Sequence, residues 1–276
     1  MRIITYHDIT NPARFAEQIA YLNERYDFVG LPSVRDGLLK GITPASDREQ
    51  LVITFDDAYP SVYTEAFPVL KQLGIPATVF VISGLVGTEE PYWWEEIPYY
   101  APSKWTAAER KAKVWEVKKW PDEKRLQYIQ ELKKNSPLPR LTRKQLGWPE
   151  LLELQQAGWT IANHTHTHPM MDRCSTEEMA RQVGRCRKML DDNGCRGGRW
   201  FAYPNGNASL EAERILRQEG IELAFMFDHK VSRPETRTPL RVSRLSMDSE
   251  ASVLKTWLIV SGLHSEYMKL RRSVGL

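Results

Sequence analysis

Short apolar runs rich in β-branched residues alternate along this chain with amphipathic helical patterns, and this alternation restricts the possible folds more than any other feature. Seven runs read as strands, at residues 3–9, 51–57, 77–83, 159–165, 199–204, 222–228 and 242–247. Strands that alternate with helices predict βαβ units and a largely parallel sheet. The chain has 276 residues, a length at which single α/β barrels are common.

Helix start and stop signals frame three of the helical patterns between these runs. The patterns over 60–73, 176–193 and 210–219 each end immediately before a glycine. The first begins at a proline, and the other two follow a serine that can cap the helix. We therefore expect helices at these positions.

Polar residues gather where the predicted strands end. Each run is almost entirely apolar until its C-terminal end, which is typical of a strand buried on both faces. The polar residues at these ends are His7 and Asp8, Asp56 and Asp57, the segment 164–168, and the segment 203–205. Parallel α/β folds place their functional sites at the C-terminal ends of the strands, so we expect one site there.

Three of the six histidines alternate in the sequence ANHTHTHPM, residues 162–170. In an extended strand His164, His166 and His168 would all point the same way. In a helical turn only the first and third would share a face. Such a dense cluster predicts a metal site, and the residues alone leave open which of the three bind.

Two adjacent carboxylates occur in the sequence TFDDAYP, residues 54–60. At the end of a buried strand, Asp56 and Asp57 would repel each other and resist desolvation unless a cation lay nearby. In a regular strand they would face opposite sides, so both reach one site only if the chain turns there. A competing interpretation is that Asp57 caps the following helix.

Residues 90–148 interrupt the alternation. They hold six of the nine tryptophans and two helical patterns, 105–119 and 122–135, and residues 104–146 carry 13 Lys and Arg against 5 Asp and Glu. We expect a helical insertion within a single domain over 1–276. The insertion is either an amphipathic hairpin packed on the barrel, or a lid or basic aromatic surface for an anionic lipid or sugar phosphate.

Composition excludes several classes of protein. The net charge of +3 is too small to indicate a nucleic-acid partner. No run approaches the roughly 20 apolar residues of a membrane helix, and the N-terminus is too short and polar for a signal peptide. The three cysteines form no CxxC pair, which favours free thiols. We expect a cytoplasmic protein that contacts the inner membrane peripherally if at all.

Taken in order, Thr54–Asp57, His164–His168 and Phe201–Gly206 resemble the motifs of the polysaccharide deacetylase family, the NodB-like carbohydrate esterases of family 4. The family motifs are TFDD, H-S/T-x-x-H, and R-x-P-Y or FAYPYG. The last form resembles a branch found among surface-polysaccharide genes. The resemblance runs from Tyr6 to about Leu263. It implies an α/β fold, a distorted (β/α)7-type barrel known as the NodB homology fold.

By this resemblance, Asp57, His164 and His168 bind a divalent metal. His166 would be a neighbour, and Thr165 would hold the loop by hydrogen bonds. Two nitrogen ligands and one carboxylate suit zinc, with cobalt or nickel as alternatives.

The resemblance also implies a reaction, the hydrolysis of an N-acetyl group on an amino sugar. The sugar would belong to a polysaccharide, a lipid-linked glycan or a sugar-nucleotide precursor. Asp56 would be the general base for a metal-activated water, and a backbone N–H at the Tyr203 turn would hold the oxyanion. Asn205 stands where the family usually has tyrosine, so we expect different substrate contacts.

Two departures from the family pattern lead to further expectations. Ala202 occupies the place of the arginine that orients the catalytic aspartate, and Arg244 can replace it or form an ordinary ion pair. His264 resembles the family's late histidine acid, although it follows a helical pattern rather than a strand. His7 and Asp8 are interpreted as rim residues.

Two other functions are compatible with these residues. One is a catalytically inactive relative that binds glycan or scaffolds a glycan-assembly complex. The other is a different metal hydrolase that uses His164 and His166 as an HxH pair. That pair normally lies on the first barrel strand, whereas here it comes past the middle of the chain.

Overall fold

A computed structural model describes residues 1–41, 47–232 and 238–266, and the remainder of the predicted domain over 1–276 lies outside the described residues. The strands are β1 (Arg2–Tyr6), β2 (Asp27–Phe28), β3 (Gln50–Asp56), β4 (Ala77–Val81), β5 (Thr160–Asn163), β6 (Gly197–Ala202), β7 (Leu223–Phe225) and β8 (Leu245–Ser246). The α-helices are α1 (Pro12–Asn23), α2 (Leu31–Lys40), α3 (Phe67–Gln72), α4 (Trp93–Tyr100), α5 (Ala107–Val117), α6 (Asp122–Asn135), α7 (Trp148–Gln156), α8 (Thr176–Asp192), α9 (Leu210–Gln218) and α10 (Val253–Val260).

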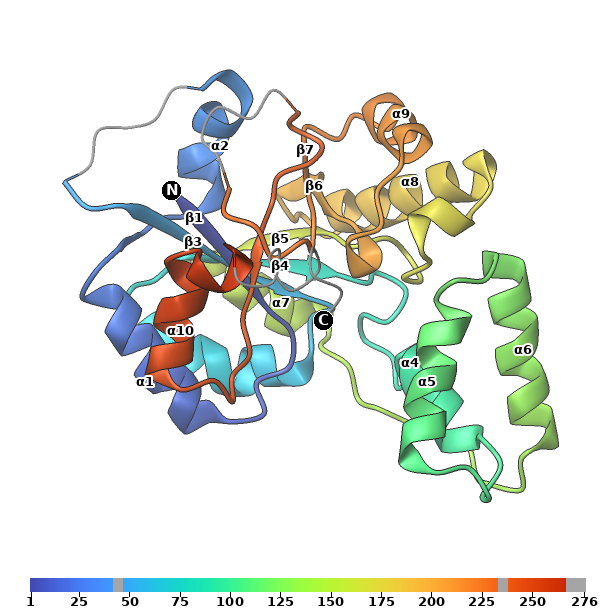
Figure 1. The fold of residues 1–276 in the computed structure, drawn as a ribbon. Helices are drawn as coiled ribbons and strands as arrows, with labels where there is room; N and C mark the ends of the chain where they lie inside the picture. Colours follow the sequence, from blue (N-terminus) through green and yellow to red (C-terminus); the bar gives the residue numbers. More distant parts are fainter. Residues whose placement is uncertain (42–46, 233–237, 267–276) are drawn as a thin grey trace.

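The strands form one parallel sheet in the order β7-β6-β5-β4-β3-β1-β8, with β2 paired to β3 (Figure 1). Each of the seven strands predicted from the sequence is present. The two-residue strand β2 was not predicted. The parallel register brings the C-terminal ends of β1, β3, β4, β5 and β6 to the same edge, as predicted for the functional site.

The segment 242–247 joins the two ends of the curled sheet. Val242 exchanges hydrogen bonds with the β7 side, where its N–H donates to Ala224 and its carbonyl accepts from Met226. A few residues later, β8 pairs with β1 and the Met247 N–H donates to Thr5. The sheet therefore has the distorted (β/α)7-type barrel architecture, and this prediction is confirmed.

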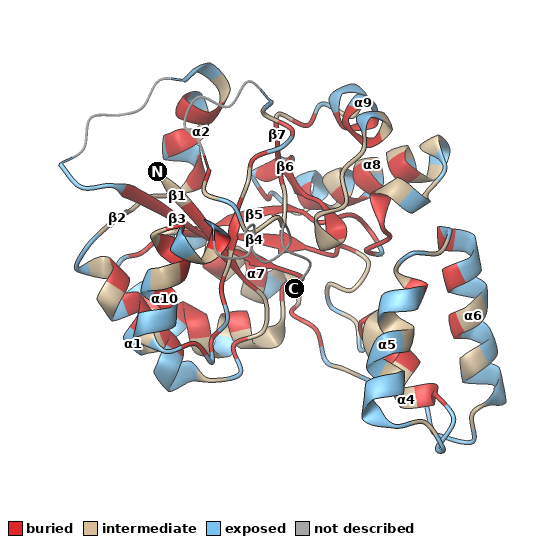
Figure 2. Cartoon of the chain, in the orientation of Figure 1, coloured by how far each residue is buried: buried red, intermediate tan, exposed pale blue. Residues whose placement is uncertain are grey.

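Apolar side chains fill both sides of the sheet. One cluster lines the inside of the curl and includes Phe80, Phe225 and Val242, with Leu31 and Leu38 of α2 packed against them. The outer face is covered by α1, α3, α7, α8, α9 and α10. Figure 2 shows the strands almost continuously buried, while the helices bury one face and expose the other. This is the burial expected of a parallel sheet between helices.

Helix boundaries follow the predicted signals, with one difference. The helices expected over 176–193 and 210–219 are α8 and α9, each with a serine side chain accepting from the third residue of its first turn. The helix expected over 60–73 begins at residue 60 as predicted, but it contains a π-helical turn, Val62–Ala66, before α3. Pro68 has no N–H to continue a regular α-helical ladder into that turn, which explains the difference.

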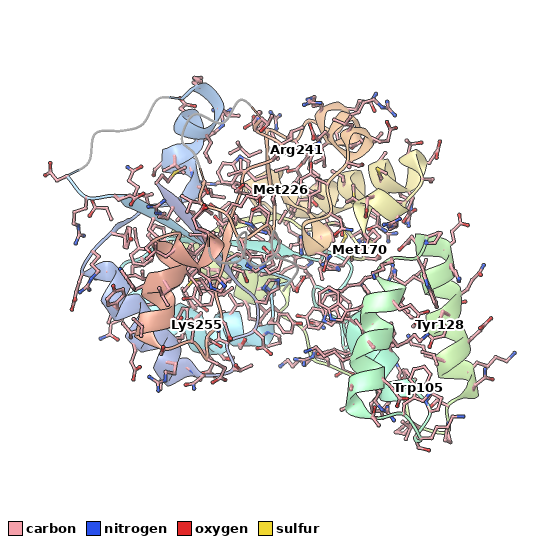
Figure 3. The ribbon with its side chains drawn as sticks, viewed as in Figure 1. Trp105, Tyr128, Met170, Met226, Arg241 and Lys255 are labelled. Carbon is pink, nitrogen blue, oxygen red and sulfur yellow. The ribbon has the colours of Figure 1, made fainter. Side chains whose placement is uncertain are left out.

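The insertion folds as three helices, α4, α5 and α6, beside the rim of the barrel (Figure 1). The patterns predicted over 105–119 and 122–135 are α5 and α6, and α4 was not predicted. A small apolar cluster contains Trp93, Ile97 and Val117 of the insertion together with Met170, which follows β5 and is labelled in Figure 3. Met170 thus anchors the insertion to the barrel.

Among the described residues, no helix is long and apolar enough to cross a membrane. The three cysteines are free thiols, as predicted. That the chain forms a single domain stays a prediction.

Candidate active site

Two left-handed residues bring the adjacent aspartates to one place. Asp56 is the last residue of β3, and Asp57 and Ala58 follow it with φ values of 68° and 55°. This conformation is costly for residues other than glycine, typically about 1–3 kcal/mol, and persists only where the surroundings enforce it. The turn that the sequence required for both carboxylates to reach one site is therefore present.

The histidine loop sorts its three histidines into two environments. His164 continues β5, with its N–H donating to the Val81 carbonyl. Thr165 (φ 70°) and His168 (φ 55°) then reverse the chain, and the Thr165 Oγ1 accepts from the His168 N–H at 2.9 Å. The predicted role of Thr165 in holding the loop thus has a matching hydrogen bond.

His166 points away from its two neighbours. Its Nδ1 lies 3.0 Å from the Ser83 Oγ, and its backbone N–H donates to the Gln182 side chain. Gly84 packs so closely that an added Cβ would lie 2.6 Å from the His166 carbonyl oxygen. Burial, together with the charges of nearby arginines, lowers the pKa of His166 to about 4. His166 is therefore a buried neighbour of the site rather than part of it.

Asp57, His164 and His168 form a buried group that could hold a metal ion. Their ligand atoms all lie within 4.8 Å of one another, and the Asp57 Oδ1 is 3.2 Å from the His164 Nε2 and 3.4 Å from the His168 Nε2. The Ala202 carbonyl accepts from the His164 Nδ1 at 2.8 Å, which leaves the Nε2 lone pair facing Asp57.

The donor set of this group fits a divalent cation. The Asp57 Oδ1 is buried and makes no hydrogen bond with the described residues, although two imidazole nitrogens face it. Burial alone would raise the pKa of Asp57, but the two histidines that face its carboxylate outweigh burial and hold the pKa below the ordinary value. An ionised carboxylate with two imidazoles is a ligand set that suits zinc and related ions.

Arg244 holds Asp56 in a two-pronged ion pair. The Arg244 Nη1 and Nη2 each donate to one Asp56 oxygen at 2.7 Å, and both side chains are buried. The guanidinium also donates to Thr5, Thr54 and the Met226 carbonyl. Burial raises the pKa of Asp56, but the charge of Arg244 outweighs it and the pKa is lowered. The structure thus brings Arg244 to the carboxylate it was expected to orient.

A pocket of about 570 Å³ opens onto these groups. His7 lies in its wall, with its Nε2 4.0 Å from an Asp56 oxygen and its ring edge against Phe227. Asp8 instead accepts from the Ser61 hydroxyl and does not line the pocket. Of the two rim residues predicted on β1, only His7 faces the site.

Two predicted site residues lie elsewhere. The Tyr203 N–H donates to the Phe225 carbonyl, and its buried ring packs between the sheet and α9, with its hydroxyl donating to Leu240. The N–H of Tyr203 itself is thus engaged in the β6–β7 pairing, and an oxyanion contact from another backbone N–H of this turn stays a prediction. The residue of that turn that lines the pocket is Asn205. His264 lies in a helical turn after α10 and does not line the pocket.

The insertion contributes aromatic residues that the sequence analysis did not assign to the site. The Tyr92 hydroxyl donates to the Asp57 carbonyl at 3.4 Å, and the Trp93 Nε1 donates to the His168 carbonyl at 3.1 Å. The Trp94 ring lies 4.6 Å from the His168 ring. These contacts hold the backbone of two left-handed residues of the candidate metal group. The sequence signal was the run Tyr-Trp-Trp at the start of the insertion.

A curled parallel sheet with an Asp-His-His group at its C-terminal edge defines an α/β barrel protein with a candidate metal centre. The polysaccharide deacetylase family matches residues 44–224, more than half of the chain. This protein therefore belongs to the polysaccharide deacetylase family, as its motifs predicted.

Curated relatives and solved structures agree with this assignment. The poly-β-1,6-N-acetyl-D-glucosamine N-deacetylase of Staphylococcus aureus strain MSSA476 is 21% identical over 225 residues, 78% of this chain and 59% of that protein. The enzyme of the same name from Staphylococcus epidermidis is 22% identical over 216 residues, 74% of this chain and 57% of that protein. The chain thus spans somewhat more than half the length of these relatives.

Two solved structures show the same fold. The Streptococcus pyogenes deacetylase PplD, in complex with acetate, has a TM-score of 0.68 at 18% identity and covers 94% of this chain and 97% of its own. IcaB from Ammonifex degensii has a TM-score of 0.63 at 21% identity and covers 90% of this chain and 91% of its own. At these identities the likeness shows the fold.

Proposed function

We propose that this protein is a metal-dependent hydrolase that removes the N-acetyl group from an amino sugar of a glycan or glycan precursor. The observation that carries this proposal is that two adjacent aspartates with different partners line the same pocket. Asp57 joins two histidines, and the adjacent Asp56 is held by Arg244. The names of the curated relatives, which describe N-deacetylases of poly-β-1,6-N-acetyl-D-glucosamine, support the same reaction.

Asp57, His164 and His168 would hold the cation, which we propose to be zinc, with cobalt or nickel as alternatives. A bound divalent cation supplies Lewis acidity, which activates water and polarises a carbonyl. Contacts within the chain orient the proposed ligands. The Ala202 carbonyl fixes the His164 tautomer, and the Trp93 Nε1–H holds the backbone carbonyl of His168. Partners of this kind orient metal ligands and typically change affinity by about 10–100-fold.

Asp56 would accept the proton of the attacking water. The Arg244 guanidinium occupies one lone pair on each Asp56 carboxylate oxygen, and a second lone pair on each oxygen remains to accept a proton. The lowered pKa keeps this carboxylate ionised, at some loss of basicity. Arg244 would act as a positioning residue, because it fixes the carboxylate in one orientation without facing the pocket.

His7 would donate the proton that the leaving amine needs. It lines the pocket, its Nε2 lies beside Asp56, and it belongs to neither the metal group nor the Asp56–Arg244 pair. An imidazole can carry a proton near neutral pH, which suits it to this step. His264, the other candidate from the sequence, does not line the pocket.

Asn205 would supply the backbone N–H that stabilises the oxyanion. It takes over this role from Tyr203, because it occupies the left-handed position of the turn (φ 57°) and lines the pocket. One such donor typically contributes about 10²–10³ in rate.

The alternatives are less well supported. The positions of Arg244 and His7 argue against an inactive glycan-binding relative, because they offer candidates for the arginine and the acid that the motifs left unassigned. A hydrolase built on His164 and His166 does not fit, because His166 bonds to Ser83 outside the group. A cytoplasmic location, a peripheral contact with the inner membrane and a role in cell-surface polysaccharide synthesis stay predictions.

The test is acetate release that depends on metal and on Asp56. Chelated protein is reloaded with zinc, cobalt or nickel and given oligomers of β-1,6-linked N-acetylglucosamine and UDP-N-acetylhexosamines. We expect acetate from the reloaded protein and none from the chelated protein or from metal-loaded Asp56→Asn. Turnover by the Asp56→Asn variant at the parent rate would contradict the role of Asp56.

A further inference from the structure

A basic and aromatic stripe on α5 forms one wall of the pocket. Lys111, Trp115 and Lys118 are spaced at i, i+4 and i+7, which places them on one side of the helix, and all three line the pocket. A helix packed on a barrel normally presents apolar residues at this spacing. Here the stripe is charged at both ends, and Trp115 in its middle is 52% exposed.

Lys118 is a half-buried cation without a carboxylate partner among the described residues. Its Nζ donates to the Asn205 Oδ1 at 2.9 Å and lies 4.4 Å from the centre of the Trp115 ring. Burial lowers the pKa of Lys118, and the charge of Asp57, which raises it, does not offset this effect. Since an ammonium group has three N–H donors, two remain for a ligand. A half-buried cation whose hydrogen-bonding partners are neutral calls for a functional explanation.

The Asn205 amide is held in the orientation that Lys118 needs. Its Nδ2 donates to the Asn207 Oδ1 at 2.8 Å, and the Asn207 Nδ2 donates in turn to Asp172. The carbonyl oxygen of Asn205 therefore faces the insertion. Asn205, which stands where the family usually has tyrosine, thus serves here as the hydrogen-bond acceptor for Lys118 of the insertion.

The other charges near this wall are already engaged. The Arg110 guanidinium donates to the carbonyls of Pro98, Pro102 and Trp105, so its charge serves the fold of the insertion. Asp56 and Asp57 face Arg244 and the two histidines. Within the described part of the chain, Lys111 and Lys118 line the pocket wall and form no ion pair with a carboxylate.

We infer that the substrate carries a phosphate beside its acetamido sugar, bound by Lys118 and Lys111, with Trp115 stacked against a sugar ring. The inference rests on the proposed N-deacetylase function and names its substrate class, a phosphorylated N-acetylated sugar. Charge-assisted contacts with phosphate oxygens are stronger than neutral hydrogen bonds. The phosphate can come from a sugar nucleotide, a lipid-linked sugar or a phosphodiester-linked glycan, since all three present the same oxygens.

The test compares matched substrates with and without phosphate. Acetate release by metal-loaded protein is measured as kcat/KM for N-acetylglucosamine 1-phosphate and for N-acetylglucosamine, with UDP-N-acetylglucosamine and an isoprenyl-diphosphate-linked N-acetylglucosamine as separate arms. We expect a preference of about 10–100-fold for the phosphorylated sugar. The preference should fall toward one in Lys118→Met and be retained in Lys119→Met, a neighbouring exposed lysine outside the pocket wall.

A second measurement separates this inference from the proposed function. Calorimetric titration of metal-loaded Asp56→Asn with N-acetylglucosamine 1-phosphate reports binding without turnover. Equal turnover of both sugars by the parent protein would overturn the inference and leave the deacetylase standing. Binding that depends on phosphate, with no acetate released by the parent, would support the inference and overturn the deacetylase. Lys118→Gln and Lys111→Met provide the same comparison if Lys118→Met is poorly folded.

Discussion

Replacement of Arg244 by methionine should destabilise the fold by removing the partner of a buried charge. Arg244 is fully buried and Asp56 is 2% exposed, and the guanidinium makes hydrogen bonds to Asp56, Thr5, Thr54 and the Met226 carbonyl. Methionine fills a similar unbranched volume but leaves the carboxylate unpaired. Breaking a buried pair in this way typically costs about 3–5 kcal/mol. For a chain of this size that corresponds to a fall in Tm of roughly 6–20 °C.

The assay is chemical and thermal denaturation of chelated protein, which removes any contribution from bound metal. Arg14→Met serves as the control, because Arg14 forms an exposed pair with Glu17 and its replacement should change stability by no more than about 0.5 kcal/mol. The double replacement Asp56→Leu with Arg244→Met should recover much of the lost stability, since an apolar pair can substitute for a buried ion pair.

Two results would refute this reasoning. One is a Tm for Arg244→Met within about 2 °C of the parent, which would show that the pair contributes little to the fold. The other is a double variant no more stable than Arg244→Met, which would show that lost packing rather than the unpaired carboxylate causes the destabilisation. Neither Arg244→Met nor the double variant should release acetate, because the first loses the residue that positions the proposed base and the second also loses the base.

Three further predictions concern the histidines and the loop that holds them. His168→Ala should weaken metal binding by more than about 100-fold in calorimetry, whereas His166→Ala should retain one metal per chain; equal losses would contradict the assignment of the group. His7→Gln should lower kcat by about 10²–10⁴ with metal content unchanged, and parent-like kcat would exclude His7 as the proton donor. Gly84→Ala should lower the free energy of unfolding by about 1–3 kcal/mol, because its Cβ would meet the His166 carbonyl; unchanged denaturation would show that the loop yields.

The rim of the barrel could be predicted because the relevant signals are local in sequence. Apolar runs mark the strands, and the polar residues that end them must meet at one edge of a parallel sheet. The separation of His166 from its neighbours could not be predicted from such local signals, because it depends on two left-handed residues, Thr165 and His168, that reverse the loop. Periodicity alone left the choice between an extended strand and a helical turn open, and the loop is neither.

Other features depend on contacts between distant segments. The Arg244 guanidinium meets Asp56 across 188 positions, so the sequence could suggest the pair but not its two-pronged geometry. The engagement of the Tyr203 N–H could not be predicted from the sequence, because it depends on the pairing of β6 with β7. Helix α4 was not predicted, because its aromatic residues follow no helical periodicity and Pro98 lies inside it.

The segment 242–247 that joins the two ends of the sheet has a consequence for the order of folding. It carries Arg244, so Asp56 gains its counter-charge only after the last strand pairs with the first. During synthesis from the N-terminus, strands β1 to β7 emerge from the ribosome while this carboxylate still needs water. Folding that depends on such distant contacts is slow, and incomplete chains expose apolar surface in the meantime. Arg244, the residue proposed to orient the base, therefore reaches Asp56 only when the two ends of the sheet are joined.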